Sequence, residues 1–76
     1  MRDIEKMECL EQLGALFKEE RTRRGLTQSQ VADKTGLKQA HYSMIENGKR
    51  DAEFVTIVKI CQVLHIDLTA FIASYM

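Results

Sequence analysis

The chain of 76 residues has no proline and no tryptophan, and it has only two cysteines and two histidines. Without proline, no segment loses the backbone donor that a helix interior needs. Two cysteines outside a CxxC pair are too few for a disulfide framework or a zinc cluster. No apolar run approaches the ~20 residues that span a membrane, and the N-terminal segment is too acidic for a secretory leader. We therefore expect a cytoplasmic protein with no metal, no cofactor and no membrane contact.

The charges sum to zero, but they are unevenly distributed along the chain. Residues 1–20 carry three basic and six acidic side chains, residues 21–50 carry seven and two, and residues 51–76 carry one and three. A positive segment confined to the middle of a chain can attract phosphate whatever the overall balance. The distribution is therefore compatible with a nucleic-acid partner, although an ordinary solvated surface would also explain it.

Apolar residues recur at helical spacing along most of the chain, and no alternating run is long enough for a strand. Met7, Leu10, Leu13 and Phe17 form one such stripe on a first helix that Gly25 ends. The pattern predicts five helices, at about residues 4–24, 28–34, 38–46, 53–65 and 67–75. Short helices with short connections predict a compact all-α fold, here as a single domain over residues 1–76.

The second and third expected helices form a helix-turn-helix pattern at about residues 28–46, because a short turn with a glycine joins them. Thr27 is placed to cap the second helix, and Gly36 can adopt positive φ in the turn. Ala32 has almost no side chain, which lets the third helix cross close to the second. The apolar residues expected between these helices and the first are Val31, Leu37, Tyr42 and Ile45.

The two C-terminal helices carry a further apolar stripe and an apolar surplus. Cys61 and His65 are four residues apart and could share a helix face, but we interpret Cys61 as a buried apolar residue. Asp67 is placed to cap the last helix, where Leu68 and Phe71 are expected in the core. The stripe on the fourth helix consists of Phe54, Ile57, Ile60, Cys61 and Leu64, and the residues left over for a partner are Ile72, Tyr75 and Met76.

Three stretches, "LGALFKEERTRRGLTQSQVA", "TGLKQAHYSMIENGKR" and "TIVKICQVLHIDLTAF", resemble the phage-repressor, or Xre-type, helix-turn-helix family. The matching positions at fixed spacing are Arg21, Gly25, Thr27, Gln28, Ala32, Gly36, Ser43, Ile45, Glu46, Gly48 and Lys49. The resemblance implies a five-helix, lambda-repressor-like domain. It also implies a repressor-like transcriptional regulator that binds a specific sequence of double-stranded DNA.

The resemblance implies different roles for two glutamines that each open a helix. Gln28 would bind a DNA phosphate and brace Gln39, which would read a base in the major groove. Helix N-terminal amides favour anions, and a glutamine amide matches the donor and acceptor of adenine. The other candidate base-reading residues are Lys38, Ala40 and Ser43, with Met44 at the margin. The other candidate phosphate-binding residues are Thr27, His41, Lys49 and Arg50.

Arg21 and Glu46 are similar to an arginine–glutamate pair that ties the first helix to the third in the family. A bidentate contact between guanidinium and carboxylate suits this structural role. Two positions depart from the family pattern. Ala52 replaces a usual proline after the Lys49–Arg50 loop. Tyr42 replaces a usual Val or Ile, so either its hydroxyl reaches the surface or the helices are packed slightly apart.

One recognition helix reads too few base pairs for a genome, so we expect a homodimer on a palindromic operator, joined through the helix at 67–75. The chain itself leaves several roles open. These are a phage repressor, a restriction–modification controller, an autoregulatory antitoxin with a cognate toxin, a partner of the transcription machinery, and an interaction module without DNA binding. An enzyme is not expected, because no catalytic triad, phosphate-binding glycine loop or carboxylate pair can be assembled from the sequence.

Overall fold

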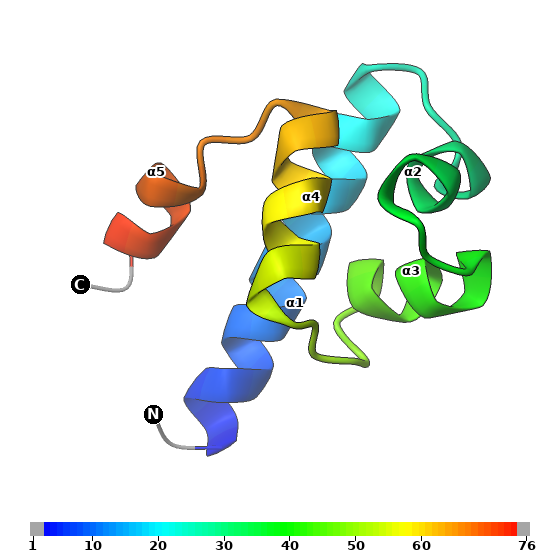
Figure 1. Cartoon of the computed structure of the whole chain (residues 1–76). Helices are drawn as coiled ribbons and strands as arrows, with labels where there is room; N and C mark the ends of the chain where they lie inside the picture. Colours follow the sequence, from blue (N-terminus) through cyan, green and yellow to red (C-terminus); the bar gives the residue numbers. More distant parts are fainter. Residues whose placement is uncertain (1–2, 75–76) are drawn as a thin grey trace.

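The computed structural model describes residues 3–74, and it contains five helices and no strand within that range. The helices are α1 (Asp3–Arg23), α2 (Gln28–Thr35), α3 (Gln39–Glu46), α4 (Phe54–Leu64) and α5 (Leu68–Ala73) (Figure 1). The predicted all-α, five-helix fold is confirmed. None of these helices is long and apolar enough to cross a bilayer.

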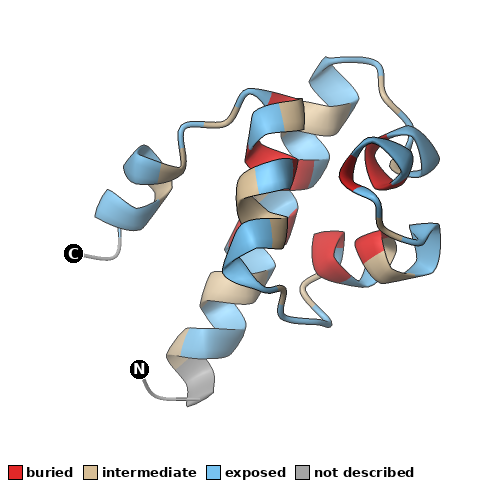
Figure 2. Ribbon diagram, viewed as in Figure 1, coloured by how far each residue is buried: buried red, intermediate tan, exposed pale blue. Residues whose placement is uncertain are grey.

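The long helix α1 and the helix α4 lie side by side, and α2 and α3 pack against this pair from one side (Figure 1). The buried residues of these four helices face one another around one core (Figure 2). Its members are Leu13, Phe17, Val31, Ala32, Tyr42, Ile45, Ile60, Cys61 and Leu64. From α5, Leu68 and Phe71 pack against this core, as expected.

One residue of each predicted apolar stripe remains exposed. Phe54 has 68% of its surface exposed, and Met7 has 60% exposed. Both residues lie near the N-terminal end of their helix, where the neighbouring helices do not cover the stripe. Helical spacing identifies the apolar face of a helix but not how far along its length a partner extends.

Local chemistry explains where the helices begin and end. The hydroxyl of Thr27 accepts the amide hydrogen of Gln30, whose side chain accepts that of Thr27 in return, which completes a capping box. Asp67 caps α5 by accepting the amide hydrogens of Thr69 and Ala70. After α2, Gly36 adopts a left-handed conformation with φ of 74°, as the turn requires.

The end of α4 reaches the same left-handed conformation without glycine. His65 follows the last helical residue with φ of 54°, and the amide of Ile66 donates back to the carbonyl of Cys61 over 2.9 Å. A side chain with a Cβ atom costs about 1 kcal/mol in this conformation. The C-terminal end of α4 is therefore less stable than a glycine would make it.

Gly14, in the middle of α1, lies against the backbone at the end of α3. A Cβ atom at this position would lie 2.7 Å from the carbonyl oxygen of Ile45 and would collide with the carbonyl of Glu46. Glycine costs about 1 kcal/mol relative to alanine inside a helix. Here it permits a contact between backbones that no other residue allows, so it fixes the distance between α1 and α3.

Candidate nucleic-acid interface

The turn between α2 and α3 places Gln28 and Gln39 each as the first residue of a helix. Lys38 precedes α3 in an extended conformation, and its side chain makes no capping hydrogen bond. Gln28 is half-buried, whereas Lys38 and Gln39 are exposed. The first amides of α3 therefore have no side-chain cap from Lys38 and are available to a ligand at this end.

The candidate base-reading residues lie on the outer side of α3. Gln39 and Ala40 are exposed, and Met44, one turn further, is also exposed. His41 and Ser43 are half-buried. The opposite side of α3 is buried in the core through Tyr42 and Ile45. One face of α3 is thus fixed in the protein while the other is free.

The loop after α3 carries the two expected cations. Lys49 and Arg50 are both exposed, and the amide of Lys49 donates to the carbonyl of Met44 over 2.9 Å. Gly48 makes this return possible with φ of 70°. Ala52, at the position of the usual proline, is half-buried and packs against the core. The backbone of the loop is therefore anchored on both sides of its cations.

Arg21 and Glu46, which the resemblance pairs, form a bidentate ion pair between α1 and α3. The guanidinium Nε and Nη2 donate to Oε2 and Oε1 of the carboxylate, each over 2.8 Å. The side chain of Glu46 is 1% exposed and that of Arg21 is 14% exposed. Arg21 Nη1 also donates to the carbonyl of Leu26 over 2.8 Å, so all three guanidinium nitrogens donate hydrogen bonds.

Gln28 makes a contact that the sequence did not suggest. Its Nε2 donates to Oε1 of Glu46 over 3.1 Å, which adds a third hydrogen bond to that carboxylate. Burial alone would raise the pKa of Glu46, but hydrogen bonds from Arg21 and Gln28 outweigh it and hold the pKa below its ordinary value. The ionised carboxylate therefore positions the first side chain of α2.

Tyr42 is fully buried, so the alternative in which its hydroxyl reaches the surface was wrong. The hydroxyl lies near Glu46 and Arg21, yet it makes no hydrogen bond of acceptable geometry with the described residues. Burial raises the pKa of Tyr42, and the neighbouring carboxylate adds to this. The larger side chain is accommodated inside the core rather than beside a ligand.

Arg24 is exposed, and it also has a structural role. Its Nε donates to the carbonyl of Leu64 over 2.7 Å and so caps the end of α4 from the end of α1. Arg23 is exposed and forms an ion pair with Glu20 at 2.6 Å. A basic residue near a helix C-terminus suggests such capping, but sequence alone does not show which helix it reaches.

The expected subunit interface is only partly described. Ile72 is exposed on α5, whereas Tyr75 and Met76 lie outside the described residues. Cys61 is buried, and burial raises the pKa of its thiol. Within residues 3–74, no three His, Cys, Asp or Glu side chains are grouped closely enough to hold a metal ion.

Residues 17–71 match the family described as helix-turn-helix, HTH_3, and this range covers most of the chain. The chain belongs to the HTH_3 family. It is a family of DNA-binding transcriptional regulators, and the match includes the two helices α2 and α3 and the turn that joins them. Gly14 and Ile72 both lie outside the matched range.

Three similar proteins support this membership. The chain is 36% identical to Antitoxin HipB of Escherichia coli (strain K12) over 69 residues, which cover 91% of this chain and 78% of that relative. It is 39% identical over 55 residues to the uncharacterized HTH-type transcriptional regulator YqaF of Bacillus subtilis (strain 168), covering 72% of each. It is 31% identical over 65 residues to the regulator y4dJ of Sinorhizobium fredii, covering 82% of this chain and 84% of the relative.

Proposed function

We propose that this HTH_3 protein is a repressor-like regulator that inserts α3 into the major groove of a specific DNA sequence. The supporting observation is the contrast between the two sides of α3. Gln39 and Ala40 are exposed at its N-terminal end, while Tyr42 and Ile45 fix its other side in the core. A helix held in this way presents its first residues to base edges in a defined orientation.

The two glutamines have separate tasks in this proposal. Gln39 reads a base, because its amide can donate and accept in the same plane as adenine does. Gln28 binds a phosphate, because a primary amide has two hydrogens and only one of them is donated to Glu46. The second hydrogen is available to the DNA backbone. Glu46 therefore orients Gln28 before DNA arrives.

Substitution of each residue, with binding measured on the operator and on single-base variants of it, tests this division. Gln39→Ala should weaken operator binding by about 1–3 kcal/mol and relax the preference at one base position per half-site. Gln28→Ala should weaken binding to all sequences evenly, because phosphates carry no base identity. If Gln39→Ala ranks all variants as the wild type does, α3 does not read the sequence in the proposed manner.

Lys49→Ala separates a charged phosphate contact from the uncharged one of Gln28. It should reduce the slope of log affinity against log salt by about one per subunit, whereas Gln28→Ala should leave this slope nearly unchanged. The matched control is Lys59→Ala, since Lys59 is exposed and belongs to α4 rather than to the loop after α3. Equal slopes for all four proteins would contradict a phosphate contact at Lys49.

We further propose that two copies bind a palindrome, with half-site centres about 34 Å apart or a multiple of it. The apolar end of the chain supports this, since Ile72 is exposed although α5 is anchored to the core through Phe71. Sedimentation should show a dimer on DNA, and truncation before Ile72 should weaken both association and DNA affinity. A monomer at micromolar concentration, free and on DNA, would contradict the dimer.

A second candidate function is that of an autoregulatory antitoxin, and the similarity to Antitoxin HipB favours it. Such a protein would bind the toxin encoded beside it and would use the same α3 face on its own operator. Expression of the neighbouring gene alone should arrest growth, and co-expression of this chain should restore it. If expression of the neighbouring gene does not arrest growth, the antitoxin function is excluded and a general transcriptional regulator remains. A chain that binds neither heparin nor operator DNA would instead be an interaction module.

A further inference from the structure

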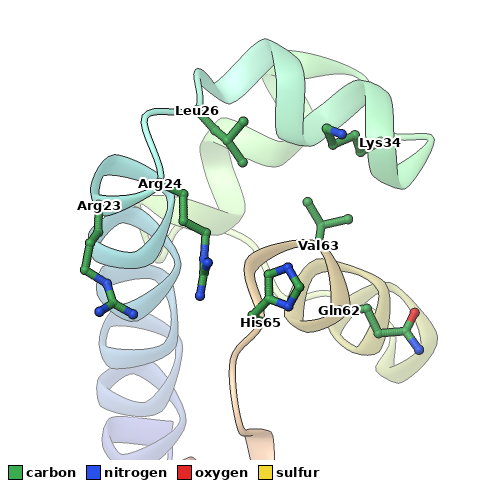
Figure 3. A pocket seen from close by; sticks show the side chains of 7 residues that line it. All are labelled: Arg23, Arg24, Leu26, Lys34, Gln62, Val63 and His65. Atoms are coloured by element: carbon green, nitrogen blue, oxygen red, sulfur yellow. The ribbon is translucent and has the colours of Figure 1, made fainter.

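The C-terminal ends of α1, α2 and α4 meet around an open depression of about 650 Å³ (Figure 3). Five nitrogen-bearing side chains surround it, namely Arg23, Arg24, Lys34, Gln62 and His65. Leu26 and Val63 point into the space between the helices and give it an apolar part (Figure 3). Neither α3 nor the loop with Lys49 contributes a lining residue. The depression is therefore distinct from the proposed DNA interface.

The positive charge of this depression is not fully neutralised by the residues that the structure describes. Arg23 and Arg24 share one carboxylate, that of Glu20, at 2.6 Å and 3.7 Å. Lys34 makes no hydrogen bond or ion pair with the described residues and is exposed. The partial negative charges at the helix C-termini offset some of the excess. An acidic group placed between Arg23 and Lys34 would still find unpaired donors.

An apolar depression of about 370 Å³ adjoins the basic one, between α1 and α5. Arg23 and His65 line both, and the apolar part comes mainly from Leu16, Ile66 and Phe71. Two carboxylates also line it, but Glu20 is engaged by the two arginines and Asp67 caps α5. His65 holds its position between the two at the cost of a left-handed backbone conformation. Strain of this kind tends to occur at functional positions. Together, the two depressions offer cations beside apolar surface.

We propose that these two depressions, which we call the C-terminal groove, dock an acidic, amphipathic segment of a protein partner. Its carboxylates would pair with Arg23 and Lys34, and its apolar side chains would cover Leu26 and Phe71. Both depressions are open to solvent and would not enclose a small ligand, which favours an extended segment. A partner docked there leaves α3 free, so the protein could bind it and DNA together.

A titration of the ¹⁵N-labelled full chain with a synthetic peptide of alternating Glu and Leu pairs tests the groove. The matched peptide carries Gln in place of every Glu. The Glu peptide should shift amide signals around residues 23–26, 34 and 62–66, and the Gln peptide should bind roughly tenfold more weakly. Shifts centred on α3 would overturn the proposal, because the peptide would then only imitate DNA. Equal shifts with inorganic phosphate would also overturn it, in favour of a small-anion site.

Charge reversal inside and outside the groove completes the test. Lys34→Glu should weaken binding of the Glu peptide by about tenfold, and Lys34→Gln should have the same direction with a smaller effect. Lys59→Glu makes the same charge change on an exposed part of α4 that does not line the groove, so it should change affinity less than about twofold. Equal effects of Lys34→Glu and Lys59→Glu would overturn the proposal. DNA binding of the Lys34 variants should be retained. This would show that the variants are folded and that the loss of peptide binding does not arise from a change in the proposed DNA contacts.

Discussion

Replacing Glu46 by glutamine removes one charge from a site that three donors share. The carboxylate accepts from Nε and Nη2 of Arg21, each at 2.8 Å, and from Nε2 of Gln28 at 3.1 Å. A glutamine amide has one acceptor oxygen, so its NH₂ group must face one of these donors. The guanidinium, only 14% exposed, would also lose its charged partner. Loss of one partner of a well-buried pair costs about 3 kcal/mol.

This cost is large for a small domain. A chain of this length has a free energy of unfolding of about 4–11 kcal/mol, and 1 kcal/mol changes the melting temperature by about 4–8 °C. Glu46→Gln should therefore lower the melting temperature by about 12–24 °C and reduce the urea midpoint with little change in slope. The control is Glu8→Gln, because Glu8 is exposed on α1. Melting of the two variants within about 2 °C of each other would refute the reasoning.

The pH dependence offers an independent measurement on the same pair. The folded protein lowers the pKa of Glu46, so the stabilisation is present above the unfolded value of about 4.3 and is lost as the pH falls through the folded value. The difference in stability between wild type and Glu46→Gln should therefore shrink below about pH 4.3. A difference that stays constant down to pH 2 would show that the charge of Glu46 contributes nothing.

Two further substitutions test the buried hydroxyl and the strained helix end. Tyr42→Phe removes a buried hydroxyl without a hydrogen-bond partner, so in urea unfolding the stability should be unchanged or higher by up to about 1 kcal/mol. Folding raises the pKa of Tyr42, so the wild type should lose stability above about pH 10, and the phenylalanine variant should lose less. Equal losses of stability at alkaline pH would contradict this. His65→Gly should raise the free energy of unfolding by about 0.5–1 kcal/mol, whereas His65→Ala should not, since alanine keeps the Cβ atom; a gain in both would point away from backbone strain.

Most of the fold could be predicted because its signals are local. The hydroxyl of Thr27, the carboxylate of Asp67 and the conformational freedom of Gly36 act within a few residues, and each ends or begins a helix where the pattern indicated. The core positions on α2 and α3 also followed from helical spacing. The exposure of Phe54 could not be predicted, because burial depends on where another helix stops and helical spacing does not encode this.

The candidate site was predictable as a set of residues but not as a set of contacts. The family resemblance paired Arg21 with Glu46, but it did not reveal that Gln28 donates a third hydrogen bond to that carboxylate. A long polar side chain has several rotamers, and its choice depends on neighbours far along the chain. The bond from Arg24 to the carbonyl of Leu64 joins residues forty apart, so no local pattern indicates it.

The contact at Gly14 bears on how the protein can adapt to DNA. Backbone meets backbone there, so no flexible side chain can absorb a displacement between α1 and the end of α3. Seven residues later, about 10 Å along α1, Arg21 holds the same turn of α3 through Glu46. A helix clamped at two such points cannot pivot by itself. Differences in operator geometry should therefore be met by bending of the duplex or by tilting of whole subunits. How much variation in half-site spacing the protein accepts would then depend on the contact between subunits and not on movement of α3.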